Sequence, residues 1–308
     1  MIDVIKVNDE GLVAALYLPP VPAREKAPAI IVLSGSDGGI ATTAMHGEPL
    51  AALGYAVLAL AYFAMDGLPR DLVEIPLEYF KRAIDWLRAH PAVDPERIGL
   101  LGHSRGGEAA LLIAATYPEV RLVVANVPSH VVWAGIDPDT WQRRSSWNLG
   151  GVGRPFVSLL RPPDASTSWR ELFEETLRDA VAAADAAAIP VERIKGPILF
   201  VTGSDDGVWP SAEMADLAIE RLKRHTFPFS YEHARYRDAG HAILMPPYRV
   251  GPINNPWPSS SYTPPRWFAS AQIQLGGTSE GNRLARMAAW PAMTAFLAQH
   301  FQSNQERV

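Results

Sequence analysis

The feature that most constrains the fold is an alternation of short apolar runs with helical patterns along the chain. This alternation is typical of strand, helix, strand units, whose parallel strands are buried on both faces and therefore read as continuous apolar runs. It predicts an α/β fold with a mostly parallel sheet of about eight strands and helices on both faces. We expect these strands at Ile2–Val7, Leu12–Leu18, Ala29–Leu33, Tyr55–Ala61, Ile98–Leu101, Leu122–Val127, Ile198–Thr202 and Phe229–Tyr236.

One segment interrupts this alternation. Residues 129–195 begin rich in Trp, Arg and Pro and continue as a polar helical pattern, after which apolar strand residues resume at Pro197. We interpret residues 129–195 as an insertion that caps the sheet edge, and we call it the cap insertion. The whole chain, residues 1–308, then forms a single α/β domain.

Composition excludes several classes of partner. The chain of 308 residues has 28 Lys and Arg against 33 Asp and Glu, so its net charge of −5 disfavours nucleic acid and anionic membrane surfaces. It has no cysteine, which excludes disulfides and a cysteine nucleophile. The longest uncharged apolar stretch, residues 51–65, is too short to span a membrane, and the acidic residues near the amino terminus predict a cytoplasmic protein.

The strongest signal for chemistry is the G-x-S-x-G pattern around Ser104, between a predicted strand and a nearly apolar helix over Glu108–Tyr117. A nucleophilic serine must lie on a sharp turn with its hydroxyl accessible, and Gly102 and Gly106 let the strand and the helix approach closely. Chance produces such a pattern often, so its position in the chain carries the interpretation. The alternative is a tight structural turn.

A serine hydroxyl needs a base that removes its proton and an acid that orients the base, here in the chain order Ser, Asp, His. Of the eight histidines, His241 is the best placed, because it follows the last predicted strand; the alternative is a surface histidine in a turn. The acid is Asp205 or Asp206, just after the strand Ile198–Thr202. Spacing does not decide between these neighbours.

Acyl transfer also needs backbone N–H donors for the developing oxyanion. We expect one from Arg105 and a second from the glycine-rich turn over Leu33–Gly39, where we favour Ser36 with Asp37 as the alternative. The glycine spacing of this turn fits neither a dinucleotide fingerprint nor a phosphate-binding loop. His and Asp do not cluster at metal-ligand spacing, so we expect neither a metal nor a cofactor.

Several segments together resemble one family. They include Val57–Phe63, Gly99–Glu108, Gly203–Asp206 with Trp209 and Ser211, and Gly240–His241 followed by Pro246–Tyr248. In this order, from about Gly11 to Phe301, the chain resembles the catalytic domain of the acyl-CoA thioesterase and bile acid-CoA:amino acid N-acyltransferase family, relatives of the dienelactone hydrolases.

This resemblance implies an α/β-hydrolase fold, Asp206 as the acid, and a small-molecule acyl thioester such as acyl-CoA as substrate. N-acyltransferase members use a cysteine where this chain has Ser104, which favours hydrolysis over transfer to an amine. A carboxylesterase of the dienelactone hydrolase kind is the alternative. Larger members carry a β-sandwich domain ahead of the catalytic domain, whereas about 28 residues precede the first central strand here.

Aromatic residues of the cap insertion could contact the acyl chain of the substrate, or they could simply pack as the core of the insertion. These residues are Trp133, Trp141, Trp147 and Phe156. The sequence indicates neither the acyl chain length nor the oligomeric state.

Overall fold

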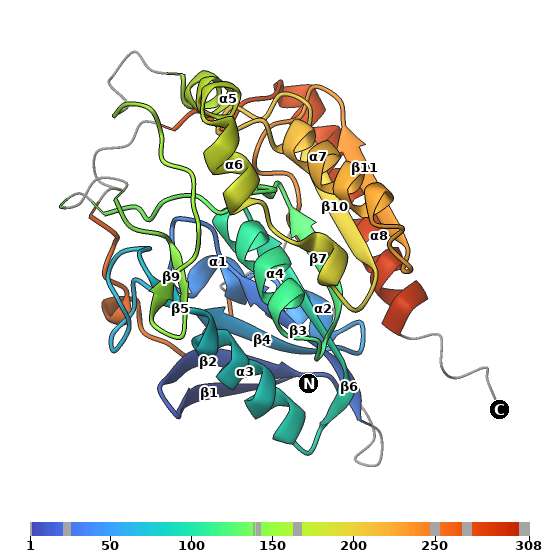
Figure 1. Cartoon of the computed structure of the whole chain (residues 1–308). Coiled ribbons are helices and arrows are strands. Elements are labelled where there is room, and N and C mark those ends of the chain that lie inside the picture. Colours follow the sequence, from blue (N-terminus) through green and yellow to red (C-terminus); the bar gives the residue numbers. More distant parts are fainter. Residues whose placement is uncertain are drawn as a thin grey trace.

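Eight strands form the main sheet of the computed structural model, which describes residues 2–20, 26–137, 139, 143–162, 168–246, 253–266 and 273–301 (Figure 1). The strand order is β1-β2-β4-β3-β6-β7-β10-β11. Strand β2 is antiparallel to both of its neighbours and all other pairs are parallel, which confirms the predicted mostly parallel sheet. The strands are β1 (Asp3–Asp9), β2 (Leu12–Leu18), β3 (Ala27–Leu33), β4 (Ala56–Ala61), β6 (Val93–His103), β7 (Val120–Asn126), β10 (Ile198–Gly203) and β11 (Tyr231–Tyr236).

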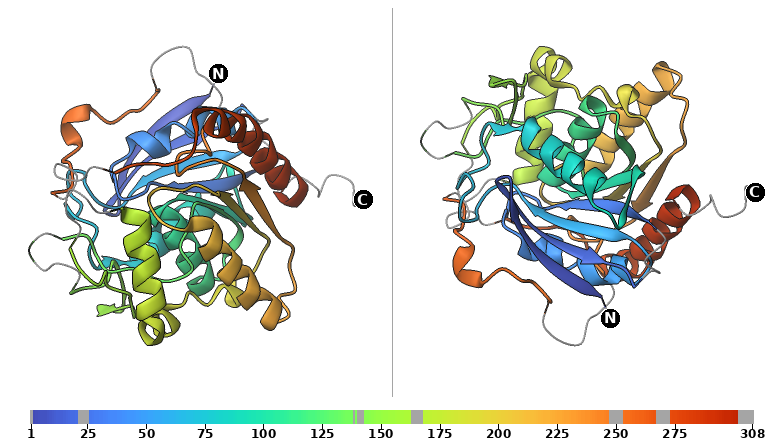
Figure 2. Two further views of the ribbon diagram at one scale, coloured as in Figure 1. Left: turned by 90° about the horizontal axis from the view of Figure 1, so that it is seen from above. Right: turned by 90° about the horizontal axis from the view of Figure 1, so that it is seen from below.

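Helices cover both faces of this sheet, as the two views of Figure 2 show. In β3, Ala29 and Ile31 belong to the buried cluster that includes residues of α3, α4 and α7, whereas Ile30 and Val32 belong to the cluster that includes residues of α1, α2 and α8. Burial on both faces is the reason that this strand is apolar at every position. The helices are α1 (Ala41–Ala44), α2 (Gly47–Ala51), α3 (Leu77–Ala89), α4 (Arg105–Thr116), α7 (Ser211–Arg224) and α8 (Ser279–Phe301).

The cap insertion lies between β7 and β10 in the chain. Its strands β8 (Trp147–Leu149) and β9 (Val152–Gly153) join β5 (Ile75–Pro76) in a small separate sheet. Its predicted helix is present as two helices, and α5 lies next to the start of α7 (Figure 1), where Arg170 contacts Glu213 at 3.2 Å. Trp141 lies outside the described residues. The helical elements are α5 (Trp169–Asp179), α6 (Val181–Ala187) and the short η1 (Val191–Arg193).

Candidate active site

Ser104 lies on the sharp turn between β6 and α4. Its backbone has φ 56° and ψ −118°, a conformation that non-glycine residues rarely adopt. Hydrogen bonds on both sides hold it there: Ser104 N–H donates to the Asn126 carbonyl at 2.9 Å, and Glu108 N–H donates to the Ser104 carbonyl at 3.0 Å. Such strain costs about 1–3 kcal/mol and is concentrated at functional sites. The turn therefore has the local geometry of a nucleophile elbow.

The two glycines of the G-x-S-x-G pattern allow β6 and α4 to meet. A Cβ atom on Gly102 would stand 1.9 Å from the Gly106 carbonyl oxygen, and one on Gly106 would stand 2.3 Å from the Ser34 carbonyl oxygen. Both obstacles are backbone atoms, which cannot rotate away. The close approach predicted from the sequence is therefore present, and it brings the turn after β3 against the start of α4.

Asp206 and His241 form a buried hydrogen-bonded pair. The His241 Nδ1 atom lies 2.9 Å from Oδ1 and 2.8 Å from Oδ2 of Asp206. Asp206 is 0% exposed, and its carboxylate also accepts the backbone N–H of Val208 at 2.9 Å and the Ser211 hydroxyl at 2.6 Å. Asp205 is exposed and makes no such contact. Of the two neighbouring aspartates, the structure thus brings Asp206 to His241.

The hydrogen bond to Asp206 determines which ring nitrogen of His241 carries the proton. A carboxylate only accepts, so Nδ1 must be the protonated nitrogen. The other nitrogen, Nε2, is then free to accept a proton from a neighbouring group. This is the tautomer that a general base needs when its substrate lies on the Nε2 side.

His103 precedes the predicted nucleophile in the chain, and its ring lies beside that of the predicted base. Its ring centroid is 5.1 Å from that of His241, with the planes at 63°, and its Nδ1 is 2.8 Å from Asn126 Nδ2. Burial lowers the pKa of His103 well below its usual value, and repulsion from His241 acts in the same direction, so His103 is neutral at pH 7. Among the described residues, no hydrogen bond joins the Ser104 hydroxyl to His241.

The turn that follows β3 lies beside Ser104. A Cβ atom on Gly35 would stand 3.2 Å from the Ser104 Cβ and 3.2 Å from Asp37 Oδ1. Ser36 is half-buried in this turn, and Arg105, as the first residue of α4, has an N–H that the helix does not use. Burial raises the pKa of Asp37 above its usual value. The assignment of Ser36 and Arg105 as oxyanion donors stays a prediction.

Gly276 and Gly277, which the sequence analysis did not assign to the site, lie between the turn that carries Asp206 and the turn that carries His241. The backbone N–H of His241 donates to the Leu275 carbonyl at 2.8 Å, and Asp206 forms a β-bridge with Gly276. Gly276 and Gly277 have φ of 75° and 71°, which favour glycine. The Gly-Gly dipeptide was the available sequence signal, but it indicates only a turn, not what the turn touches.

The aromatic residues predicted to contact substrate are largely packed inside the protein. Trp133 and Trp147 are 2% and 0% exposed, and their indole N–H groups donate to Ser129 Oγ at 2.8 Å and Glu108 Oε1 at 2.7 Å. Phe156 is half-buried against the core that contains α3 and α4. These contacts favour the alternative interpretation, in which the residues are packing elements of the cap insertion.

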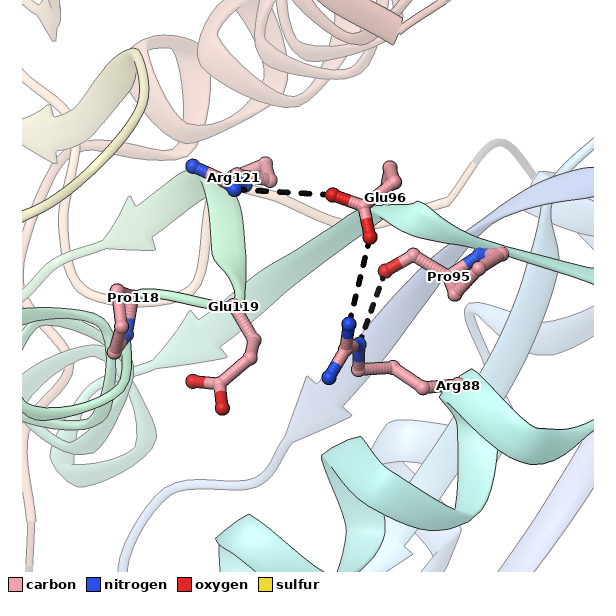
Figure 3. A pocket seen from close by; sticks show the side chains of 6 residues that line it. All are labelled: Arg88, Pro95, Glu96, Pro118, Glu119 and Arg121. Carbon is pink, nitrogen blue, oxygen red and sulfur yellow. Dashed lines mark hydrogen bonds and ion pairs between the residues drawn. The ribbon is translucent and has the colours of Figure 1, made fainter.

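A pocket lies at the opposite edge of the sheet, where β6 and β7 begin (Figure 3). Its charged groups are already engaged, since Glu96 pairs with Arg88 at 3.4 Å and with Arg121 at 3.8 Å. It shares no residue with the Ser104, Asp206 and His241 region. The residues around it are Arg88, Pro95, Glu96, Pro118, Glu119 and Arg121.

The chain matches two known protein families. Residues 75–303 match the family described as BAAT / acyl-CoA thioester hydrolase C terminal. The chain belongs to this family. A second match, to the X-Pro dipeptidyl-peptidase (S15) family, covers residues 10–137. Membership in the acyl-CoA thioester hydrolase family confirms the resemblance stated from the sequence.

Individual relatives agree with this membership. Acyl-coenzyme A thioesterase 1 of Mus musculus is 31% identical over 308 residues, which are 98% of this chain and 66% of that protein. Acyl-coenzyme A thioesterase 2, mitochondrial, of Mus musculus is 32% identical over 306 residues, 97% of this chain and 61% of that protein. The chain thus spans less than two thirds of the length of these relatives.

A solved structure confirms the α/β-hydrolase fold. A dienelactone hydrolase-like promiscuous phosphotriesterase from metagenomic libraries superimposes with a TM-score of 0.55 and 15% identity, covering 98% of both chains. At this identity the likeness concerns the fold.

Two features are absent from the described residues. None of their helices combines the length and the apolar character needed to cross a membrane. They also contain no group of three or more His, Cys, Asp or Glu side chains that could hold a metal ion.

Proposed function

We propose that the protein is a serine hydrolase that cleaves acyl thioesters such as acyl-CoA, with Ser104 as nucleophile, His241 as base and Asp206 as acid. The buried Asp206–His241 pair carries this proposal, because it lies at the same edge of the sheet as the strained Ser104 turn. Membership in the acyl-CoA thioester hydrolase family supports a thioester as the substrate. A cytoplasmic location stays a prediction.

The reaction proceeds in two stages. Ser104 Oγ attacks the acyl carbonyl carbon while its proton passes to His241 Nε2, and Asp206 stabilises the imidazolium through the Nδ1–H group. The oxyanion accepts hydrogen bonds from the N–H groups of Arg105 and Ser36. As the tetrahedral intermediate collapses, His241 gives the proton to the leaving thiolate, and an acyl-enzyme and a free thiol result.

Water then completes the cycle. His241 Nε2 removes a proton from a water molecule, whose oxygen attacks the acyl-enzyme carbonyl. The second tetrahedral intermediate releases the carboxylic acid when His241 returns the proton to Ser104 Oγ. Every step uses side chains and backbone groups of this chain, and no cofactor takes part.

A carboxylesterase is the second candidate. The fold shared with a dienelactone hydrolase-like enzyme is compatible with this activity, and a fold by itself does not assign a substrate. Oxygen esters would use the same three residues, so the site geometry does not separate the two activities. Transfer of the acyl group to an amine is a third outcome, which a serine nucleophile favours less than hydrolysis.

A side-by-side assay with purified protein tests the proposal. Acyl-CoAs, p-nitrophenyl esters and lactones are compared by kcat/KM, and products are analysed with competing amines present. We expect acyl-CoA to be preferred by at least about tenfold, which corresponds to about 1.4 kcal/mol of transition-state binding. A preference of that size for oxygen esters would instead establish the carboxylesterase.

The Ser104→Ala variant tests the nucleophile. It should lose at least about 10³-fold in kcat and should no longer react with a fluorophosphonate probe. Turnover that is unchanged in this variant would contradict the assignment of Ser104.

A further inference from the structure

A buried ion pair occupies the first turn of the helix that follows Ser104. Arg105 Nη1 lies 2.8 Å from Glu108 Oε2, and the two side chains are 5% and 0% exposed. Burial of two charges costs several kcal/mol per ion unless other polar groups compensate. Burial raises the pKa of Glu108 to about 7 even though Arg105 opposes this effect. An apolar pair would pack here at lower cost, so the partners of these two charges need an explanation.

Glu108 directs its second oxygen at the cap insertion. Its Oε1 atom accepts the indole N–H of Trp147 at 2.7 Å and the backbone N–H of Trp133 at 3.2 Å. Trp147 is the first residue of β8, and Trp133 forms a β-bridge with Val157. One carboxylate therefore connects two separate segments of the insertion to α4.

Arg105 contacts the same part of the insertion. Its Nη2 atom donates to the carbonyls of Trp133 at 3.2 Å and Ala134 at 3.1 Å, and also to the Ser146 hydroxyl. Among the described residues, every hydrogen-bond partner of the two side chains outside α4 therefore belongs to residues 133–147. Directional hydrogen bonds to charged groups fix one arrangement, which apolar packing alone does not.

The cap insertion also contacts the turn that carries Asp206. Arg170 of α5 donates from Nη1 to the Asp206 carbonyl at 3.0 Å and to the Ser204 carbonyl at 3.4 Å. Its guanidinium is only partly buried and also forms ion pairs with Glu174 and Glu213. Of these two side-chain attachments, the one next to Ser104 is the more deeply buried.

We propose that Arg105 and Glu108 are positioning residues that dock the cap insertion on the Ser104 turn. Because the insertion contacts both this turn and the Asp206 carbonyl, we also place the acyl chain of the substrate against it. The inference rests on the proposed function for its kinetic consequence, but docking itself is independent of catalysis. Loosening the insertion should weaken binding of long acyl chains more than it slows the reaction of bound substrate.

Two variants test this docking. Glu108→Gln removes the charge at nearly constant shape, and Trp147→Phe removes one N–H donor and keeps an aromatic ring. Trp257→Phe is the matched control, because the Trp257 indole N–H donates to the Ala14 carbonyl at 2.8 Å, outside the cap insertion. Should Glu108→Gln fail to fold, Trp147→Phe still tests the contact.

The measurements are amide hydrogen exchange and kinetics on acyl-CoAs of increasing chain length. We expect exchange to rise at least about tenfold in the described parts of residues 131–157, with β3 and α8 unchanged. KM for long acyl-CoAs should rise about tenfold while kcat changes by less than about threefold, and Trp257→Phe should show neither effect.

Two results would overturn the proposal. The first is exchange in the cap insertion that is unchanged in both variants. The second is a fall in kcat that is equal at every chain length with KM unchanged, since this marks a merely structural role. Failure of the wild-type protein to react with a fluorophosphonate probe would refute the proposed function instead, and the exchange result would still decide the docking.

Discussion

The two edges of the main sheet hold charged side chains in opposite settings. At the carboxyl edge, Asp206 is 0% exposed and accepts hydrogen bonds from backbone, hydroxyl and imidazole donors. At the amino edge, Glu96 pairs with two arginines, but its side chain is 67% exposed (Figure 3). Water screens exposed charges strongly and buried ones weakly. Burial, not residue type, therefore separates the candidate active site from the pocket at the other edge.

Neighbouring aspartates at the carboxyl edge give the sharpest test of this difference. Asp206→Asn should lower kcat by about 10³- to 10⁴-fold, because an amide in place of the carboxylate no longer selects the His241 tautomer or stabilises its charged form. Asp205→Asn, the matched control, should change kcat by less than about twofold, since Asp205 is exposed and does not contact His241. Steady-state kinetics on one acyl-CoA decide the matter, and equal effects would reject Asp206 as the acid.

The elbow should be intolerant of even one methyl group. In Gly106→Ala the new Cβ would meet the Ser34 carbonyl oxygen at 2.3 Å, so we expect the free energy of unfolding to fall by about 3 kcal/mol or more. Gly67→Ala is the control, because Gly67 has φ 82° with no atom within 4 Å and should cost only about 1 kcal/mol. Urea unfolding of both variants measures the difference. Similar losses would mean that the close approach at the elbow is not as tight as described.

Acid should destabilise the folded protein through His46, the buried residue that precedes α2. Burial lowers the pKa of His46 to about 4, from 6.5 in the unfolded chain, so the folded state binds fewer protons between these values. This contribution to stability is complete above pH 6.5 and is lost as the pH falls towards 4, by at most about 3 kcal/mol. Urea unfolding at pH 7 and pH 4.5 should show a smaller loss for His46→Gln than for the wild type. Equal losses would contradict a neutral, buried His46.

Substitution at the amino edge should have little effect on stability or activity. Glu96→Gln breaks the ion pairs with Arg88 and Arg121, but exposed pairs contribute at most about 1 kcal/mol, and less at high salt. We expect the free energy of unfolding to change by less than about 1 kcal/mol and kcat/KM to stay the same. A clear loss of activity in this variant would break the contrast between the two edges, because it would couple the exposed pocket to the site.

Prediction from sequence succeeded where contiguous residues carry the signal. The apolar alternation predicted the eight strands, and in β3 every position is buried because both faces are covered. The elbow was predictable because Gly102, Ser104 and Gly106 stand within five positions of one another. The predicted boundaries were less accurate. Strand β6 begins at Val93, before the predicted Ile98, because the residues between them are mostly polar and lack the apolar pattern of a buried strand.

Other features could not be read from the sequence. Spacing does not separate Asp205 from Asp206, and only the family resemblance favoured Asp206. The turn after β10 brings the Asp206 carboxylate to 2.8 Å from His241, which is 35 positions away. Trp133 and Trp147 carry no sequence mark that separates packing from substrate contact, and their hydrogen bonds with Ser129 and Glu108 decide where they lie.

The sequence by itself therefore determined the succession of strands and helices along the chain, the sharp turn at Ser104 and the residue types available for chemistry. Spacing left Asp205 and Asp206 open, and only the family resemblance implied Asp206. The tertiary structure decided how Asp206 meets His241, which glycine pair connects their turns, and where the charges of Arg105 and Glu108 point. The physical reason is that periodicity and turn chemistry act between neighbours in the chain. Contacts between distant loops depend on the packing of the whole sheet, which no short window of residues contains.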